Sequence, residues 1–113
     1  MPYINIRSSK EMNEQVKEEL QSKIVEIMPT IPGKNAGNTI IGIMDTFTMY
    51  NDLKPVEAVF IDIRLYQASP EESKKEFVQK LTAIIGEVLD IPAKGVHMNF
   101  FEQTNWATNG DYF

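Results

Sequence analysis

The feature that most restricts the fold of this chain is a pair of short motifs, each of which occurs twice. Tyr3–Arg7 (YINIR) and Phe60–Arg64 (FIDIR) share the pattern aromatic, Ile, polar, Ile, Arg. Further along, Ile31–Lys34 (IPGK) is repeated as Ile91–Lys94 (IPAK). Because both motifs recur in the same order and at nearly the same spacing, they indicate an internal duplication. We place the first repeat at about residues 2–44 and the second at about residues 58–102.

Each repeat has the pattern of a strand, a helix and a second strand. The two five-residue motifs alternate apolar and polar residues, and Thr39–Met44 and Val96–Phe101 are again extended and apolar. Between them, apolar residues recur at helical spacing, at Met12, Val16, Leu20, Ile24, Ile27 and Met28 and at Phe77, Leu81, Ile84, Ile85 and Val88. Such a crossover joins parallel strands. The sequence therefore predicts an α+β fold, in which duplicated β-α-β units form a four-stranded mixed sheet with two helices on one face.

Residues at the predicted helix ends and between the repeats give further expectations. Ser8 or Ser9 is a candidate cap for the first helix, and Ser69 for the second, where Pro70 follows. Asp45–Pro55 connects the repeats and has room for a short strand or turn. We expect residues 103–113 to form an irregular tail. A chain of 113 residues is long enough for one core, so we treat residues 1–113 as a single domain.

Strand alternation also predicts what lies on the sheet face that the helices leave open. If the isoleucines of both motifs face the helices, the aromatic, polar and Arg positions point the other way. A sheet face of this kind can remain in water. Its aromatic residues favour burial between copies of the chain instead. We expect a homo-oligomer whose sheets face one another and whose Asp and Arg side chains pair across the interior.

Composition and charge exclude several classes of function. The net charge of −5 and the lack of a basic run argue against nucleic acid as a partner. Apolar stretches are too short to cross a membrane, and no cleavable signal opens the chain, so we expect a soluble, cytoplasmic protein. With no Cys and a single His, at position 97, Cys-ligated zinc, disulfides and sites with two His residues are excluded.

Pro2 is the first candidate for chemistry. If Met1 is removed, the Pro2 nitrogen becomes a terminal secondary amine at the start of a strand, able to take a proton or attack a carbonyl. If Met1 stays, the same nitrogen is a tertiary amide and does neither. A proline at the second position can also occur by chance.

Taken together, these features resemble the tautomerase superfamily, most closely the branch of macrophage migration inhibitory factor (MIF) and D-dopachrome tautomerase. The resemblance rests on Pro2 at the start of a strand, the duplicated β-α-β units, the chain length, and the last strand Val96–Glu102 with its aromatic tail. It implies a homotrimer with active sites at subunit boundaries. It also implies a cofactor-independent keto–enol tautomerase for α-keto acids such as phenylpyruvate, with the terminal proline as general base.

The resemblance assigns roles to three further residues. Lys34 stands where the family has a lysine that binds the substrate carboxylate. Asn99 stands where the family has an asparagine that a neighbouring subunit supplies to the site. His97 stands where the family usually has a tyrosine. Taken alone, Lys34 reads as a solvated loop lysine, and His97 and Asn99 as ordinary residues of a sheet surface. The aromatic wall of the pocket is expected from the tail residues Trp106, Tyr112 or Phe113.

Two other functions remain open from the sequence. A dehalogenase-like enzyme of the same superfamily would be favoured if Arg7, Arg64 or Glu102 faced Pro2, which the sequence does not establish. A trimeric scaffold or signalling protein without catalysis would be favoured by retention of Met1 or by a pocket that the tail closes.

Overall fold

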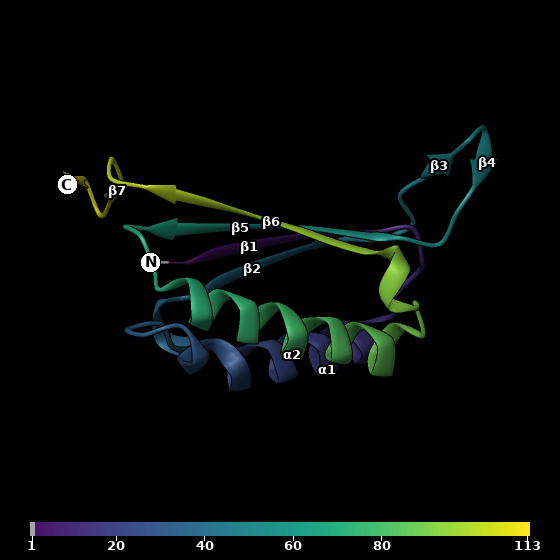
Figure 1. Ribbon diagram of the computed structural model, residues 1–113, viewed down its shortest axis with the longest axis horizontal. Helices are drawn as coiled ribbons and strands as arrows, with labels where there is room; N and C mark the ends of the chain where they lie inside the picture. The colour runs from purple at the N-terminus through teal and green to yellow at the C-terminus, as the bar shows by residue number, and fades with distance from the viewer. Residues whose placement is uncertain (1) are drawn as a thin grey trace.

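The two repeats build one mixed sheet, covered on one face by both long helices. The structure is a computed structural model that describes residues 2–113. The repeats supply β1 (Tyr3–Ser8), α1 (Glu14–Ile27) and β2 (Ile40–Met44), then β5 (Val59–Tyr66), α2 (Glu71–Leu89) and β6 (Val96–Gln103). Figure 1 shows α1 and α2 side by side beneath the sheet. The predicted α+β fold, with duplicated β-α-β units and two helices on one face, is confirmed.

The strand order shows how the two repeats are joined. The four strands lie in the order β2-β1-β5-β6. Each repeat contributes a parallel pair, β1 with β2 and β5 with β6, while β1 and β5 pair antiparallel at the centre. In that central pair, Tyr3 is opposite Arg64 and Arg7 is opposite Phe60. The two repeated motifs therefore lie against each other, head to tail.

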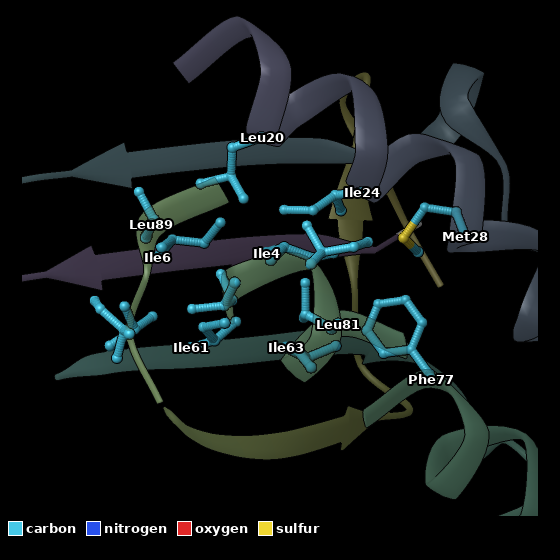
Figure 2. Packing of buried hydrophobic residues seen from close by; sticks show 14 of the residues in the cluster. Ile4, Ile6, Leu20, Ile24, Met28, Ile61, Ile63, Phe77, Leu81 and Leu89 are labelled. Carbon is cyan, nitrogen blue, oxygen red and sulfur yellow. The ribbon is translucent and has the colours of Figure 1, made fainter. Parts of the chain in front are cut away.

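Isoleucines from both motifs form the centre of the core. Ile4, Ile6, Ile61 and Ile63 are fully buried, as their alternation predicts. Figure 2 shows them between the sheet and side chains of the helices, among which Leu20, Ile24, Phe77 and Leu81 are also fully buried. Burial of one such side chain stabilises the fold by about 1.5–3 kcal/mol.

The predicted helix caps were wrong. Helix α1 begins after Asn13, whose Oδ1 accepts a hydrogen bond from the Val16 N–H at 2.8 Å. Met12 precedes the helix but is still buried in the core. Helix α2 starts after Pro70 without a side-chain cap, so Ser69 does not have the predicted role. The acidic Glu71 and Glu72 lie in its first turn, where the helix dipole favours negative charge.

Two small hairpins lie at opposite ends of the sheet. The connection between the repeats contains β3 (Tyr50–Asn51) and β4 (Lys54–Pro55), which project from one end in Figure 1. The tail forms β7 (Ala107–Thr108) and β8 (Asp111–Tyr112) at the other end, near the start of β1. The tail is therefore a hairpin rather than the irregular segment that we expected. Three short 3-10 turns complete the described chain, at Met28–Thr30, Ala36–Asn38 and Ala93–Gly95.

The uncovered face of the sheet carries both apolar and charged side chains. Phe60 and Phe101 are exposed there. Arg7 forms an ion pair with Asp62, with 2.6 Å between Nη2 and Oδ2, so this Arg and Asp pair within one chain. Within residues 2–113, no helix is long and apolar enough to cross a membrane. The same residues contain no cluster of His, Asp or Glu side chains arranged to hold a metal ion.

Two glycines in the second repeat offer a matched test of the packing. A Cβ on Gly95 would lie 2.8 Å from the backbone oxygen of Glu57, which cannot move easily. A Cβ on Gly86, inside α2, would meet nothing closer than 3.8 Å. We expect Gly95→Ala to destabilise the protein by about 1–3 kcal/mol because of overpacking. Gly86→Ala should stabilise it by about 0.5–1 kcal/mol because alanine favours the helix.

Urea unfolding of both variants measures these free energies. A Gly95→Ala variant as stable as the parent would contradict the close approach of the turn before β6 to the chain at Glu57.

Candidate functional site

Pro2 lines a cavity at the end of the sheet. Its side chain is buried, and its carbonyl oxygen accepts a hydrogen bond from the Ile40 N–H at 3.0 Å. The cavity has a volume of about 640 Å³. Ten residues from four strands, a turn and the tail line it: Pro2, Tyr3, Asn38, Ile40, Arg64, Gln103, Asn105, Trp106, Ala107 and Thr108. No Asp or Glu is among these lining residues.

The sheet topology explains why these segments meet. Because the two repeats run antiparallel to each other, β1 and β2 start at the end of the sheet where β5 and β6 finish. Tyr3 therefore lies opposite Arg64, and Arg64 lies opposite Phe101. The Tyr3 ring extends over Gly42 of β2, where an added Cβ would lie 3.0 Å from the Tyr3 hydroxyl oxygen.

Aromatic side chains from β5 and the tail form a wall beside this cavity. The Tyr66 ring packs edge-on against Trp106, with 6.5 Å between ring centroids. It packs at a tilt against Phe113, with 5.6 Å between centroids. The Phe113 N–H donates to the Trp106 carbonyl oxygen at 2.8 Å, which closes the tail hairpin. Of the three tail aromatics that we considered, only Trp106 lines the cavity directly. Phe113 packs behind Tyr66, and Tyr112 is largely exposed.

Lys34 lies next to the same wall but not in the cavity lining. Its Nζ donates to the backbone oxygen of Tyr66 at 3.5 Å. The loop that carries it is anchored by the buried Ile31, whose carbonyl oxygen accepts from the Lys34 N–H at 3.1 Å. Gly33, with φ of +79°, makes the turn between them. The ammonium group of Lys34 is thus held near the aromatic side of the cavity, and its role in binding a carboxylate stays a prediction.

His97 and Asn99 lie far from Pro2 of the same chain. His97 is opposite Phe60, which is opposite Arg7, at the end of the sheet away from Pro2. Strand spacing puts His97 about 20 Å from Pro2. Its ring stacks on Phe60, with centroids 5.0 Å apart and planes inclined by 11°. Asn99, opposite Asp62, is exposed on the same face.

A second, wider cavity lies at this other end. It has a volume of about 980 Å³ and is lined by His97 together with Arg7, Tyr50, Phe60 and Lys94, among other residues. One chain therefore carries two separate parts of the predicted site, Pro2 with Lys34 at one end and His97 at the other. Their roles stay predictions.

Arg64 is the lining residue that the sequence reasoning did not place. Among residues 2–113, it is the only charged side chain in the lining of the Pro2 cavity. Its Cζ lies 5.3 Å from the centroid of the Phe101 ring, within the range of a cation–π interaction. The sequence contained a signal for this position. Antiparallel pairing of the two repeated motifs puts Arg64, the last residue of the second motif, beside Tyr3, the first residue of the first motif.

An ion pair secures the segment from which the cavity-forming tail departs. Glu102, near the end of β6, accepts from Lys74 Nζ of α2 at 2.8 Å and from the Ser69 N–H at 2.6 Å. The Lys74 hydrogen bond, followed by that of Ser69, lowers the pKa of Glu102 below its ordinary value. Hydrogen bonds from Lys74 to Glu102 and then Glu71 raise the pKa of Lys74. Both groups are therefore charged at neutral pH and tie β6 to α2.

Comparison with known proteins gives a clear result at the level of structure. No protein family model and no curated protein matches the sequence. MIF2 of Leishmania major matches with a TM-score of 0.91 at 17% identity, over 100% of this chain and 97% of that one. The MIF-like protein of Entamoeba histolytica gives 0.85 at 21% identity, over 99% and 98%. An asymmetric trimer of fused 4-OT gives 0.86 at 15% identity, over 97% and 94%.

These similarities extend over almost the whole length of each chain. The protein therefore has the fold of the MIF and 4-OT structures, as the resemblance implied. At these levels of identity, the match concerns the fold.

The Glu102 ion pair predicts a pH dependence of stability. In the folded protein the pKa of Glu102 lies below its ordinary value of 4.5. The ionised carboxylate therefore contributes fully to the stability of the fold above pH 4.5, and this contribution is lost as the pH falls through the pKa of the folded state. Glu102→Gln should cost up to about 1 kcal/mol near neutral pH. The difference from the parent should shrink at lower pH.

Thermal unfolding of both proteins across the acidic range measures this difference. Glu71→Gln is the matched control, because Glu71 is the exposed partner of the same lysine and should matter less. A difference that stays constant with pH would contradict the role of the Glu102 carboxylate.

Proposed function

We propose that this protein is a keto–enol tautomerase for small 2-oxo acids of the phenylpyruvate type, with Pro2 as general base once Met1 is removed. The observation that carries the proposal is the position of Pro2, buried in the lining of a cavity with an aromatic wall, in a MIF-like fold. Met1 itself lies outside the described residues. The chemistry needs one amine and a few hydrogen-bond donors, with no cofactor.

Proton transfer at the carbon next to a carbonyl defines what the site must do. The Pro2 nitrogen takes a proton from C3 of the keto acid, and the electron pair of that C–H bond forms the C2–C3 double bond. The π electrons of the carbonyl move to its oxygen, which takes the proton from the Pro2 ammonium and becomes the enol hydroxyl. Burial in the cavity disfavours the charged form of the amine, which keeps it able to act as a base near neutral pH. Lys34 binds the substrate carboxylate beside Tyr66.

The homotrimer is part of this proposal, because the site needs residues from both ends of the sheet. Exposed apolar side chains lie at both ends of the sheet. At the Pro2 end they are Ile40, Tyr112 and Phe113, and at the end with the β3–β4 hairpin they are Phe47, Tyr50 and Leu53. Contacts between two different patches are head-to-tail, and such contacts form a ring when the rotation between subunits closes. A ring brings His97 and Asn99 of one subunit to the Pro2 cavity of the next, where they donate hydrogen bonds to the enolate. One of the similar structures is itself described as a trimer.

A dehalogenase-like activity is the second candidate, because Arg64 lines the Pro2 cavity. That reaction also requires a group that activates water. Since no carboxylate lines the cavity in residues 2–113, tautomerisation remains the better-supported proposal.

Substitution of Pro2 tests the proposed base. Pro2→Ala should lower the rate of enol loss from phenylenolpyruvate, followed by ultraviolet absorbance, by at least about 100-fold. Intact mass must first show that Met1 has been removed from both proteins. Equal rates in variant and parent would refute the role of Pro2.

Mixed oligomers test whether the site is shared between subunits. Pro2→Ala and His97→Ala chains should each be impaired alone. When equal amounts of the two chains assemble at random, about a quarter of the interfaces should pair an intact Pro2 from one subunit with an intact His97 from the next. These interfaces should restore activity. If the mixture is no more active than its components, the two residues do not act across a subunit boundary.

A further inference from the structure

The distribution of unpaired positive charge points to the Pro2 cavity. The chain has 11 Lys and Arg residues against 16 Asp and Glu residues. Among residues 2–113, most of these cations lie within ion-pair distance of a carboxylate. The exceptions are Lys34, Lys54, Lys94 and Arg64. Two of them, Lys34 and Arg64, lie at the end of the sheet that holds Pro2. In a chain with an excess of acids, their lack of a carboxylate leaves this end free to attract anions.

Arg64 is held in a position suited to a ligand. It lies between Tyr3 and Phe101 on neighbouring strands, and its Cζ is 5.3 Å from the Phe101 ring centroid. Contact with an aromatic ring restrains a guanidinium group without using its N–H donors. Within the described residues, those donors make no hydrogen bond to a side chain or carbonyl. The fork of N–H groups is therefore available for bidentate binding of a carboxylate.

Lys34 and Arg64 both lie near the end of β5. Arg64 and Tyr66 are two residues apart on β5 and so share one face, about 7 Å apart. Lys34 Nζ lies at the Tyr66 backbone oxygen, 3.5 Å away, whereas Arg64 lines the cavity beside Tyr3. Arg64 therefore lines the Pro2 cavity and Lys34 lies beside its aromatic wall, and no Asp or Glu of residues 2–113 is in the lining. A ligand with a single carboxylate would leave one of the two cations without a counter-charge.

We propose that the preferred substrate of the Pro2 site is a 2-oxo acid with a second carboxylate on C3, bound at one end by Lys34 and at the other by Arg64. This inference rests on the proposed function and names its substrate class. In this substrate the phenyl group of phenylpyruvate is replaced by a carboxylate. The proton transfer is unchanged, from C3 to the Pro2 nitrogen, with the enol proton added at oxygen. Arg64 is thus a residue that determines specificity.

The enols of oxaloacetate and phenylpyruvate form a matched pair of probes, because they differ only in the C3 substituent. We expect the parent protein, with Met1 removed, to have the higher kcat/KM with oxaloacetate. Arg64→Leu should lower the ratio of the two kcat/KM values, oxaloacetate over phenylpyruvate, by at least about tenfold, the effect of losing a charge-assisted hydrogen bond. Arg64→Lys should recover part of that ratio. Lys75→Leu, which removes an exposed charge on α2, is the matched control and should leave the ratio as it is.

Binding of unreactive ligands gives a second measurement that does not depend on turnover. Fumarate and cinnamate differ in the same way as the two enols, a carboxylate against a phenyl group. Calorimetry should show that Arg64→Leu weakens fumarate binding by at least about tenfold more than cinnamate binding. If the binding of both ligands changes equally, or if neither changes, the inference is overturned.

The outcomes separate this inference from the proposed function. Loss of both reactions in Pro2→Ala, together with an unchanged substrate ratio in Arg64→Leu, would keep the base and overturn the substrate class. Activity that survives in Pro2→Ala would overturn the proposed function, while the calorimetric comparison would still decide what Arg64 binds. Sedimentation of Arg64→Leu completes the test, since dissociation of the oligomer would assign Arg64 to subunit packing instead.

Discussion

The antiparallel pairing of β1 with β5 is the contact on which the rest of the structure depends. It joins the two repeats through their most similar segments, so that Tyr3 meets Arg64 and Arg7 meets Phe60. The same pairing puts the buried isoleucines of both strands on one face, where the two helices cover them. A shift of one residue in this register would turn every isoleucine toward the opposite face. The register therefore determines the core and the cavity at the same time.

Much of the fold could be predicted from the sequence, because apolar periodicity reports burial directly. The alternation in the two motifs allows only one face for Ile4, Ile6, Ile61 and Ile63, and the structure agrees. The helix starts could not be predicted in this way, since a serine can bond to several partners. Ser9 Oγ accepts from the Ala58 N–H at 2.9 Å and does not cap α1. Its tertiary contact is invisible in the local sequence.

The tail hairpin had a signal that the sequence reasoning passed over. Asn109 and Gly110 have φ of 55° and 79°, the left-handed conformation that an Asn-Gly pair adopts in a two-residue hairpin turn. The candidate site was predictable only in part, for a different reason. Pro2 and Lys34 lie at one end of a chain and His97 at the other, and a single sequence does not state which ends of two copies meet. Arg64 was named as a residue that could face Pro2, but its place in the cavity lining depends on the register of β1 and β5, which the sequence analysis did not use.

The position of Tyr3 above Gly42 makes the cavity sensitive to a residue outside it. Gly42 lies on β2 and is absent from the cavity lining, yet it provides the flat surface over which the Tyr3 ring extends. A larger side chain there would displace the Tyr3 ring, which itself borders the cavity. Substitution of this glycine would therefore change the shape of the cavity, and with it the ligands that fit, without changing any residue that lines it.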